Sequence, residues 1–124
     1  MRKSMIGTGL LAGALLLAAC ASSPSGDLPQ QIVGLWGDDS TPNTPHIDFA
    51  EDGTLTGSDG CNLLDGTYTT DDDEVVVSLG FTTLMACIGV DTWLRDIASA
   101  SVDDDVLIVY NADDEQIGTL TRAG

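Results

Sequence analysis

The sequence predicts a mainly β domain with one short helix, folded as a curled antiparallel sheet or a small open β-barrel. Short apolar or alternating runs are separated by turns rich in Asp, Asn and Gly, which is typical of successive hairpins. Residues 71–74 form an acidic turn between two β-branched runs, and residues 111–115 form a similar turn near the C-terminus. A sheet built from such hairpins buries its edges when it curls.

We expect a first strand over residues 32–36, with Trp36 as a core anchor. A second strand is expected over residues 46–49, where Ile47 and Phe49 alternate with polar residues and therefore point into the core. Further strands are expected from Leu55 onward, at 67–69, at 75–79, at 106–110 and at 117–121.

Residues 91–98 are the one segment for which we predict a helix, of about two turns. Asp91 can cap its N-terminus. Trp93, Leu94 and Ile97 fall on one face at helical spacing.

The N-terminal residues have the composition of an export signal. Arg2 and Lys3 precede an apolar run at residues 5–19, which is shorter than the roughly 20 apolar residues of a membrane-spanning helix. The tetrapeptide Leu17-Ala18-Ala19-Cys20 resembles the lipobox of bacterial lipoproteins. We therefore expect a signal peptide at 1–19 and a lipid on Cys20, with a plain secretory signal as the alternative.

This lipid would anchor the exported protein at the outer face of the cytoplasmic membrane, or in an outer membrane if the organism has one. Residues 20–30 are expected to be the lipidated end and a flexible tether, because residues 21–27 are rich in Ser, Pro and Gly. Residues 31–124 then form the folded domain.

The expected mature chain is strongly acidic. Arg95 and Arg122 are its two basic residues against 20 acidic ones, a net charge of −18. Such a field repels nucleic acids and anionic lipid headgroups, so nucleic acid is not an expected partner. Most of the acidic residues are aspartates, which favour turns, and a solvated surface is the first interpretation of them. Salt adaptation and weak cation binding are the alternatives.

No cofactor, metal or catalytic set is expected. His46 is the sole histidine, and its place just after Pro45 suggests an exposed residue on a strand edge. Cys61 and Cys87 lack the spacing and partner ligands of a zinc site. In an exported protein this even pair predicts a disulfide, which would stabilise the fold by about 3.5 kcal/mol on the chain-entropy model.

The stretch from Asp52 to Cys87 contains Asp-Gly, Gly-Cys-Asn, Gly-Thr-Tyr and Thr-Leu-Met-Ala-Cys elements. In this order and spacing they resemble the META/HslJ domain, a small β-rich domain often found on bacterial lipoproteins. The resemblance implies a curved β-structure with one helix. It also implies family positions that we interpret as structural, namely Gly53, Gly57, Gly60, Asn62, Gly66, Tyr68, Thr83 and Met85.

The function expected first is that of a non-catalytic envelope lipoprotein, which supports the envelope or stress tolerance through protein or envelope contacts. The alternative is a binding module that holds a small apolar ligand in the curled sheet. A thiol oxidoreductase is a remote alternative, because a reactive thiolate needs a nearby cation and this chain has few.

Overall fold

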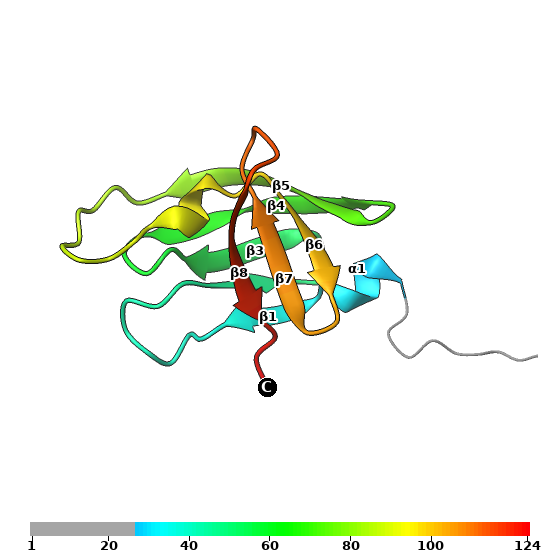
Figure 1. The fold of residues 1–124 in the computed structure, drawn as a ribbon, viewed down its shortest axis with the longest axis horizontal. Helices are drawn as coiled ribbons and strands as arrows, with labels where there is room; N and C mark the ends of the chain where they lie inside the picture. The colour runs from blue at the N-terminus through cyan, green and yellow to red at the C-terminus, as the bar shows by residue number, and fades with distance from the viewer. Residues whose placement is uncertain (1–26) are drawn as a thin grey trace, which may run out of the picture.

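A computed structural model describes residues 27–124, which form one antiparallel sheet curled into a nearly closed barrel (Figure 1). The eight strands are hydrogen-bonded in chain order, so the expected fold class is confirmed. They are β1 (Gly34–Gly37), β2 (His46–Phe49), β3 (Thr54–Ser58), β4 (Leu63–Asp71), β5 (Glu74–Thr82), β6 (Ser99–Asp103), β7 (Val106–Tyr110) and β8 (Gln116–Thr121).

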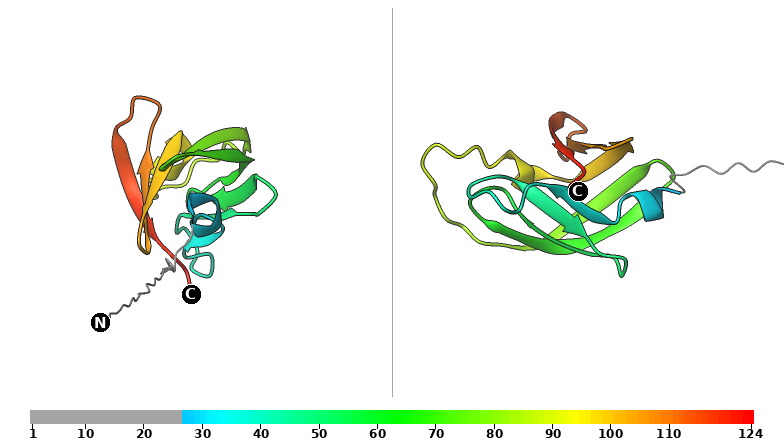
Figure 2. Two further views of the ribbon diagram at one scale, coloured as in Figure 1. Left: turned by 90° about the vertical axis from the view of Figure 1, so that its right-hand side faces the viewer. Right: turned by 90° about the horizontal axis from the view of Figure 1, so that it is seen from below.

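The last strand returns to the first and nearly closes the barrel. Arg122 forms an isolated antiparallel bridge with Trp36, and the Ala123 N–H donates to the carbonyl of Leu35 at 2.9 Å. The Arg122 guanidinium lies over the Trp36 ring at 4.1 Å from its centroid. The two views of Figure 2 show the sheet wrapped round on itself, with β8 in red beside the blue and cyan N-terminal elements.

The barrel interior is filled by hydrophobic side chains from every strand. Trp36, Ile47 and Phe49 are fully buried, as their strand positions predicted. The Trp36 indole N–H donates to the carbonyl of Ile32 at 2.9 Å, so its polar group is also satisfied. The other buried hydrophobic residues are Ile32, Leu55, Leu64, Val75, Val77, Leu94, Ile97, Ala100, Leu107, Val109 and Leu120.

The predicted helix over residues 91–98 is wrong in type and length. The segment contains a single 3-10 turn, η1 (Trp93–Asp96), and Ile97 is already extended at φ −60° and ψ 129°. Ala98 is then free to bond the sheet, donating to Tyr110 at 2.8 Å and accepting from Val77 at 3.0 Å. Sheet pairing has overridden the helical pattern here.

Two elements of the structure were not predicted from the sequence. Strand β6 reads Ser-Ala-Ser-Val-Asp, and its small residues give little apolar alternation. Helix α1 (Leu28–Gln31) has Pro29 in its first turn, where the fixed φ of proline suits a helix start. It includes residues 28–30, which were expected to be tether, and it places the buried side chain of Ile32 at the edge of the core.

The expected signal peptide and Cys20 lie outside the described residues. Within residues 27–124, no helix has the length and apolar character needed to cross a membrane.

Candidate functional site

The turn between β3 and β4 is built around a buried aspartate. Asp59 is fully buried, and its Oδ1 accepts hydrogen bonds from the backbone N–H groups of Cys61 at 2.8 Å and Asn62 at 2.6 Å. Gly60 adopts φ +98°, which side chains rarely tolerate, and donates its N–H to Ser58 Oγ at 3.0 Å. The turn therefore presents Cys61 and Asn62 in fixed directions.

Asn62 connects this turn to the segment that follows β5. Its side chain is 1% exposed. Its Oδ1 accepts from the Thr83 hydroxyl at 3.0 Å and from the Met85 N–H, while Nδ2 donates to the Met85 carbonyl at 3.1 Å. Thr83 Oγ1 also accepts from the Leu63 N–H at 3.0 Å. These bonds hold residues 83–85 against the start of β4.

Cys61 and Cys87 are joined by a disulfide with their Cα atoms 5.9 Å apart, so the predicted pairing is confirmed. Cys61 Sγ also lies 3.5 Å from the Met85 carbonyl oxygen, but this is only a contact because a disulfide sulfur carries no proton. The disulfide and Asn62 together fasten the segment after β5 at two points. We call residues 83–90 the stapled segment.

Tyr68 on β4 secures the turn between β2 and β3. Its hydroxyl donates to the Ala50 carbonyl, and its N–H donates to the Gly53 carbonyl at 2.9 Å. Its ring meets the Phe49 ring edge-on at 4.9 Å between centroids. Burial raises the pKa of Tyr68, and the nearby charge of Asp52 adds to this effect. These contacts give Tyr68 a structural role.

Gly57 and Gly66 lie within strands where a neighbouring backbone passes too close for a side chain. A Cβ on Gly66 would overlap the carbonyl oxygen of Ser78, and one on Gly57 would overlap that of His46. Gly66 also lies at a β-bulge between β4 and β5. Gly53 instead has φ +91° in the turn before β3.

The expected position of His46 is wrong. It is half-buried on β2, an interior strand, and pairs with Gly37 on one side and Ser58 on the other. Its Nδ1 is buried without a hydrogen-bond partner among the described residues. Within residues 27–124, no group of three or more His, Cys, Asp or Glu side chains is arranged to hold a metal ion.

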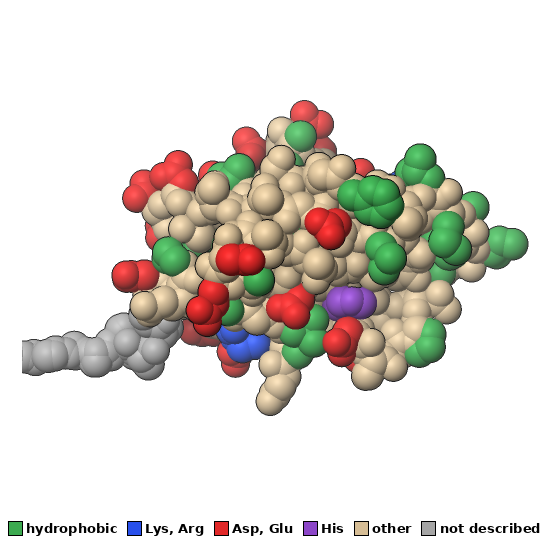
Figure 3. All heavy atoms as spheres, turned by 180° about the vertical axis from the view of Figure 1, so that it is seen from behind, with side chains coloured by type: hydrophobic (Ala, Val, Ile, Leu, Met, Phe, Trp, Pro, Cys, Tyr) green, Lys and Arg blue, Asp and Glu red, His purple; other side chains and the backbone are tan. Residues whose placement is uncertain are grey.

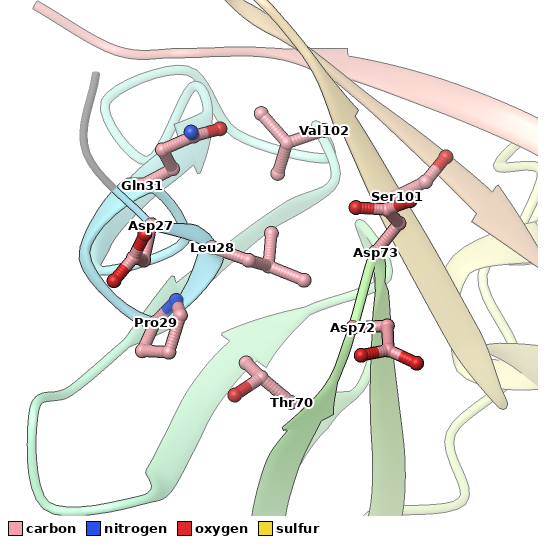
Figure 4. A pocket seen from close by; sticks show the side chains of 9 residues that line it. All are labelled: Asp27, Leu28, Pro29, Gln31, Thr70, Asp72, Asp73, Ser101 and Val102. Carbon is pink, nitrogen blue, oxygen red and sulfur yellow. The ribbon is translucent and has the colours of Figure 1, made fainter. Parts of the chain in front are cut away.

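A surface cleft of about 550 Å³ lies between α1, the tip of the β4–β5 hairpin and β6 (Figure 4). Three carboxylates line it, from Asp27, Asp72 and Asp73, and its apolar members are Leu28, Pro29 and Val102. The family positions named from the sequence do not line this cleft. It therefore forms a second surface, separate from the stapled segment.

Two residues important to this structure belong to no motif that we identified. Asp59 organises the turn that carries Cys61, and it is one acid among many in the sequence. Arg122 joins the barrel ends, donating to the Gln31 carbonyl and lying 3.6 Å from Asp105. The scarcity of basic residues was the only sequence signal for Arg122.

The antiparallel barrel, its filled core and its stapled segment define a small disulfide-containing β-domain. A family model described as the META domain matches residues 29–124, and the chain therefore belongs to this family. The family resemblance recognised in the sequence is thus confirmed. A search of curated proteins and a search of solved structures found no match to the chain.

Proposed function

We propose that this protein is a non-catalytic lipoprotein of the cell envelope, whose META domain supports the envelope or stress tolerance by contacting other proteins. The supporting observation is a concentration of exposed apolar side chains. Five of the seven large hydrophobic residues exposed among residues 27–124 belong to the start of β4, the end of β5 and the stapled segment. We call them the apolar end, which consists of Leu63, Phe81, Leu84, Met85 and Ile88.

The apolar end lies at the opposite end of the barrel from α1 (Figure 1). Figure 3 shows green hydrophobic side chains gathered on that side, while acidic side chains are prominent nearer α1. Exposed apolar clusters of this kind mark interaction sites. A lipid on Cys20 would attach the domain through the α1 end and leave the apolar end accessible to a partner.

Fastening of the backbone explains why the side chains of the apolar end stay exposed and do not pack into the core of the domain. Met85 is fixed through its backbone by Asn62, and Ile88 follows directly after the disulfide-bonded Cys87. Leu84 and Ile88 are 86% and 104% exposed. Because the backbone of this segment is already fastened, less conformational entropy is lost when a partner binds its apolar side chains.

The lipid anchor is tested by replacing Cys20. In cells that express the full chain, the wild-type protein is expected to partition into the detergent phase of a detergent extraction. Cys20→Ala is expected to leave the protein unlipidated and in the aqueous phase. Cys61→Ser is the matched control, because it removes a cysteine without touching the expected lipid site. Equal partition of Cys20→Ala and wild type would contradict the anchor.

The protein contact is tested by complementing a deletion strain under detergent stress. Wild type should restore growth, whereas Leu84→Asp with Ile88→Asp should fail although the protein is made and folded. Val76→Asp with Val106→Asp is the control, since both are exposed hydrophobic residues outside the apolar end and together receive the same two new charges. Full complementation by the double variant would reject contact through the apolar end.

The small apolar ligand remains the second proposal, with less support. Large side chains such as Trp36 and Phe49 fill the described interior, and the 550 Å³ cleft near α1 is lined by carboxylates. Purification under native conditions followed by lipid extraction tests this proposal, and recovery of an apolar compound in stoichiometric amount would support it.

The thiol oxidoreductase alternative is tested by treating the folded protein with a mild reductant. A structural disulfide between Cys61 and Cys87 should stay intact under this treatment.

A further inference from the structure

Strand β5 has an unpaired edge beside the apolar end. It pairs with β4 along almost its whole length, but with β6 only at Val75 and Val76. One further bond joins the Val77 N–H to the Ala98 carbonyl at 3.0 Å. From Ser78 to Thr82, no described strand pairs with the other side of β5. The barrel therefore has an opening in its hydrogen-bonded wall at this position.

At Leu79 the backbone of β5 is oriented to accept another strand. Alternate residues of a strand direct their N–H and C=O groups to the same side. Because Val77 donates toward the β6 side, Leu79 directs its backbone groups to that side as well. The β-bulge between β4 and β5 adds Gly80 to β5 and ends this alternation after Leu79. The residues from Ser78 to Thr82 include no proline and no charged side chain, so this bulge is the one common protection of an exposed edge among them.

Phe81 is the large apolar side chain exposed on this part of β5. It is 59% exposed and lies opposite Asp65, whereas Leu63 and Asp65 lie on β4, on the other side of β5 from the unpaired edge. Leu84 and Met85 continue the chain just beyond β5. A bound strand would thus find backbone hydrogen bonds at Leu79 and apolar contacts with Phe81, Leu84 and Met85, the two kinds of contact made in β-strand addition.

The net charge of the domain indicates which kind of strand could bind at the β5 edge. Residues 27–124 contain 20 acidic residues and two arginines, so two copies of this domain repel each other, as do the domain and an anionic lipid surface. A partner with Lys or Arg beside its apolar residues is attracted instead. An extended basic segment is complementary both to the negative charge of the domain and to the geometry of the β5 edge.

Resting on the proposed function, we propose that the domain binds an extended segment of another protein, with alternating apolar and basic residues, by strand addition at residues Ser78–Thr82 of β5. The apolar end provides the side-chain contacts, and the edge of β5 provides the backbone bonds. The bound strand fills the opening between β5 and the segment that leads to β6.

The proposal is tested with a capped ten-residue peptide of alternating valine and lysine, added to the isotopically labelled full domain in NMR titrations. Binding should shift the amide signals of Ser78–Met85 and slow hydrogen exchange at the Leu79 amide at least tenfold. A peptide methylated on alternate backbone nitrogens keeps its charge and side chains but loses half its donors. It should bind at least tenfold more weakly.

Matched variants distinguish binding at the β5 edge from general attraction to the acidic surface. Phe81→Thr removes an exposed apolar side chain and should weaken binding about tenfold. Val76→Thr changes the same strand where β6 already covers the edge, and it should change binding less than twofold. A peptide of alternating valine and glutamate should not bind, because its charge matches that of the domain.

Three results would overturn the proposal. The first is peptide-induced shifts confined to acidic turns such as residues 71–74, unaffected by backbone methylation. The second is self-association of the free domain through β5, which would make a second copy the occupant. The third is binding to neutral lipid vesicles lost in Phe81→Thr. If these occur while complementation still requires Leu84 and Ile88, the proposed function stands and only strand addition fails.

Discussion

Asn62 shows how much of this domain depends on one side chain. It satisfies the backbone N–H and C=O of Met85 and the hydroxyl of Thr83, all from a buried position. No apolar residue of similar size can replace these bonds. The cost of losing them is therefore larger than that of an ordinary surface substitution.

We expect Asn62→Ala to lower the free energy of unfolding by about 2 kcal/mol, because three partly buried hydrogen bonds to Met85 and Thr83 are lost. Urea denaturation measures this change. Thr83→Val removes the bond to Asn62 and the bond from the Leu63 N–H, two bonds against three, and should therefore cost somewhat less. A smaller effect of Asn62→Ala than of Thr83→Val would show that solvent replaces Asn62 readily.

Asp38 makes the loop between β1 and β2 sensitive to acid. Hydrogen bonds from the Ser40 side chain at 2.6 Å, the Thr41 side chain at 2.6 Å and the Ser40 N–H at 2.8 Å lower the pKa of Asp38 to about 2. Since the folded pKa lies below the ordinary value of 3.8, the charged form favours folding. This contribution is present above pH 3.8 and is lost as the pH falls toward 2.

Asp38→Asn should therefore flatten the dependence of stability on pH between about 4 and about 2. Urea denaturation at several pH values in this window provides the measurement. Asp39→Asn is the matched control, because it removes a neighbouring charge but none of the three hydrogen bonds to Asp38. Equal flattening in both variants would assign the effect to total charge.

At the scale of elements, the stapled segment and the residues after it illustrate a competition between local preference and sheet pairing. The pattern of Trp93, Leu94 and Ile97 favours a helix, and Leu94 and Ile97 are indeed buried. The Trp93 ring lies directly over Gly118 of β8, leaving no space there for a Cβ. A single 3-10 turn achieves this packing and still lets Ala98 join the sheet.

The disulfide contributes to stability mainly by restricting the unfolded chain. Its partners are 26 positions apart, which corresponds to about 3.5 kcal/mol on the chain-entropy model. Cys61→Ser should lower the melting temperature by roughly 10–20 °C and expose one free thiol at Cys87. The double replacement should be about as unstable as either single one, because the bond is already lost. Thermal unfolding with thiol titration measures both effects.

For the whole molecule, closure of the barrel depends on a contact between the two ends of the described chain. Arg122 stacks on Trp36, donates to the Gln31 carbonyl and pairs with Asp105 of the β6–β7 turn. Its side chain is 32% exposed, so solvent screens the ion pair while the stacked face is partly shielded. Stacking and hydrogen bonding therefore contribute more than the ion pair.

Arg122→Met should destabilise the domain by about 2 kcal/mol, because the stacked cation and the donor to Gln31 are both lost. Arg122→Lys should be intermediate, since lysine keeps the charge but lacks the planar guanidinium. Arg95→Met removes the other, exposed arginine and serves as the control. Equal melting temperatures for Arg122→Met and Arg95→Met would show that this contact does not close the barrel.

Several features could be predicted from sequence because they depend on short stretches of chain. The alternation at Ile47 and Phe49 correctly gave the inward face of β2, and the turns at 71–74 and 111–115 correctly indicated hairpins. The even pair of cysteines after residue 20 predicted the disulfide. The spaced glycine, Cys-Asn and Tyr elements identified the META domain.

Other features were decided only by the tertiary structure, because they join residues far apart in the chain. Arg122 meets Trp36 only when β8 reaches β1, and Asn62 meets Met85 only when β5 has turned back beside β4. The unpaired edge of β5 exists because β6 begins to pair at Val76 and not further along. Local patterns specify which residues favour strands and turns, whereas the register and extent of each pairing depend on packing across the whole barrel.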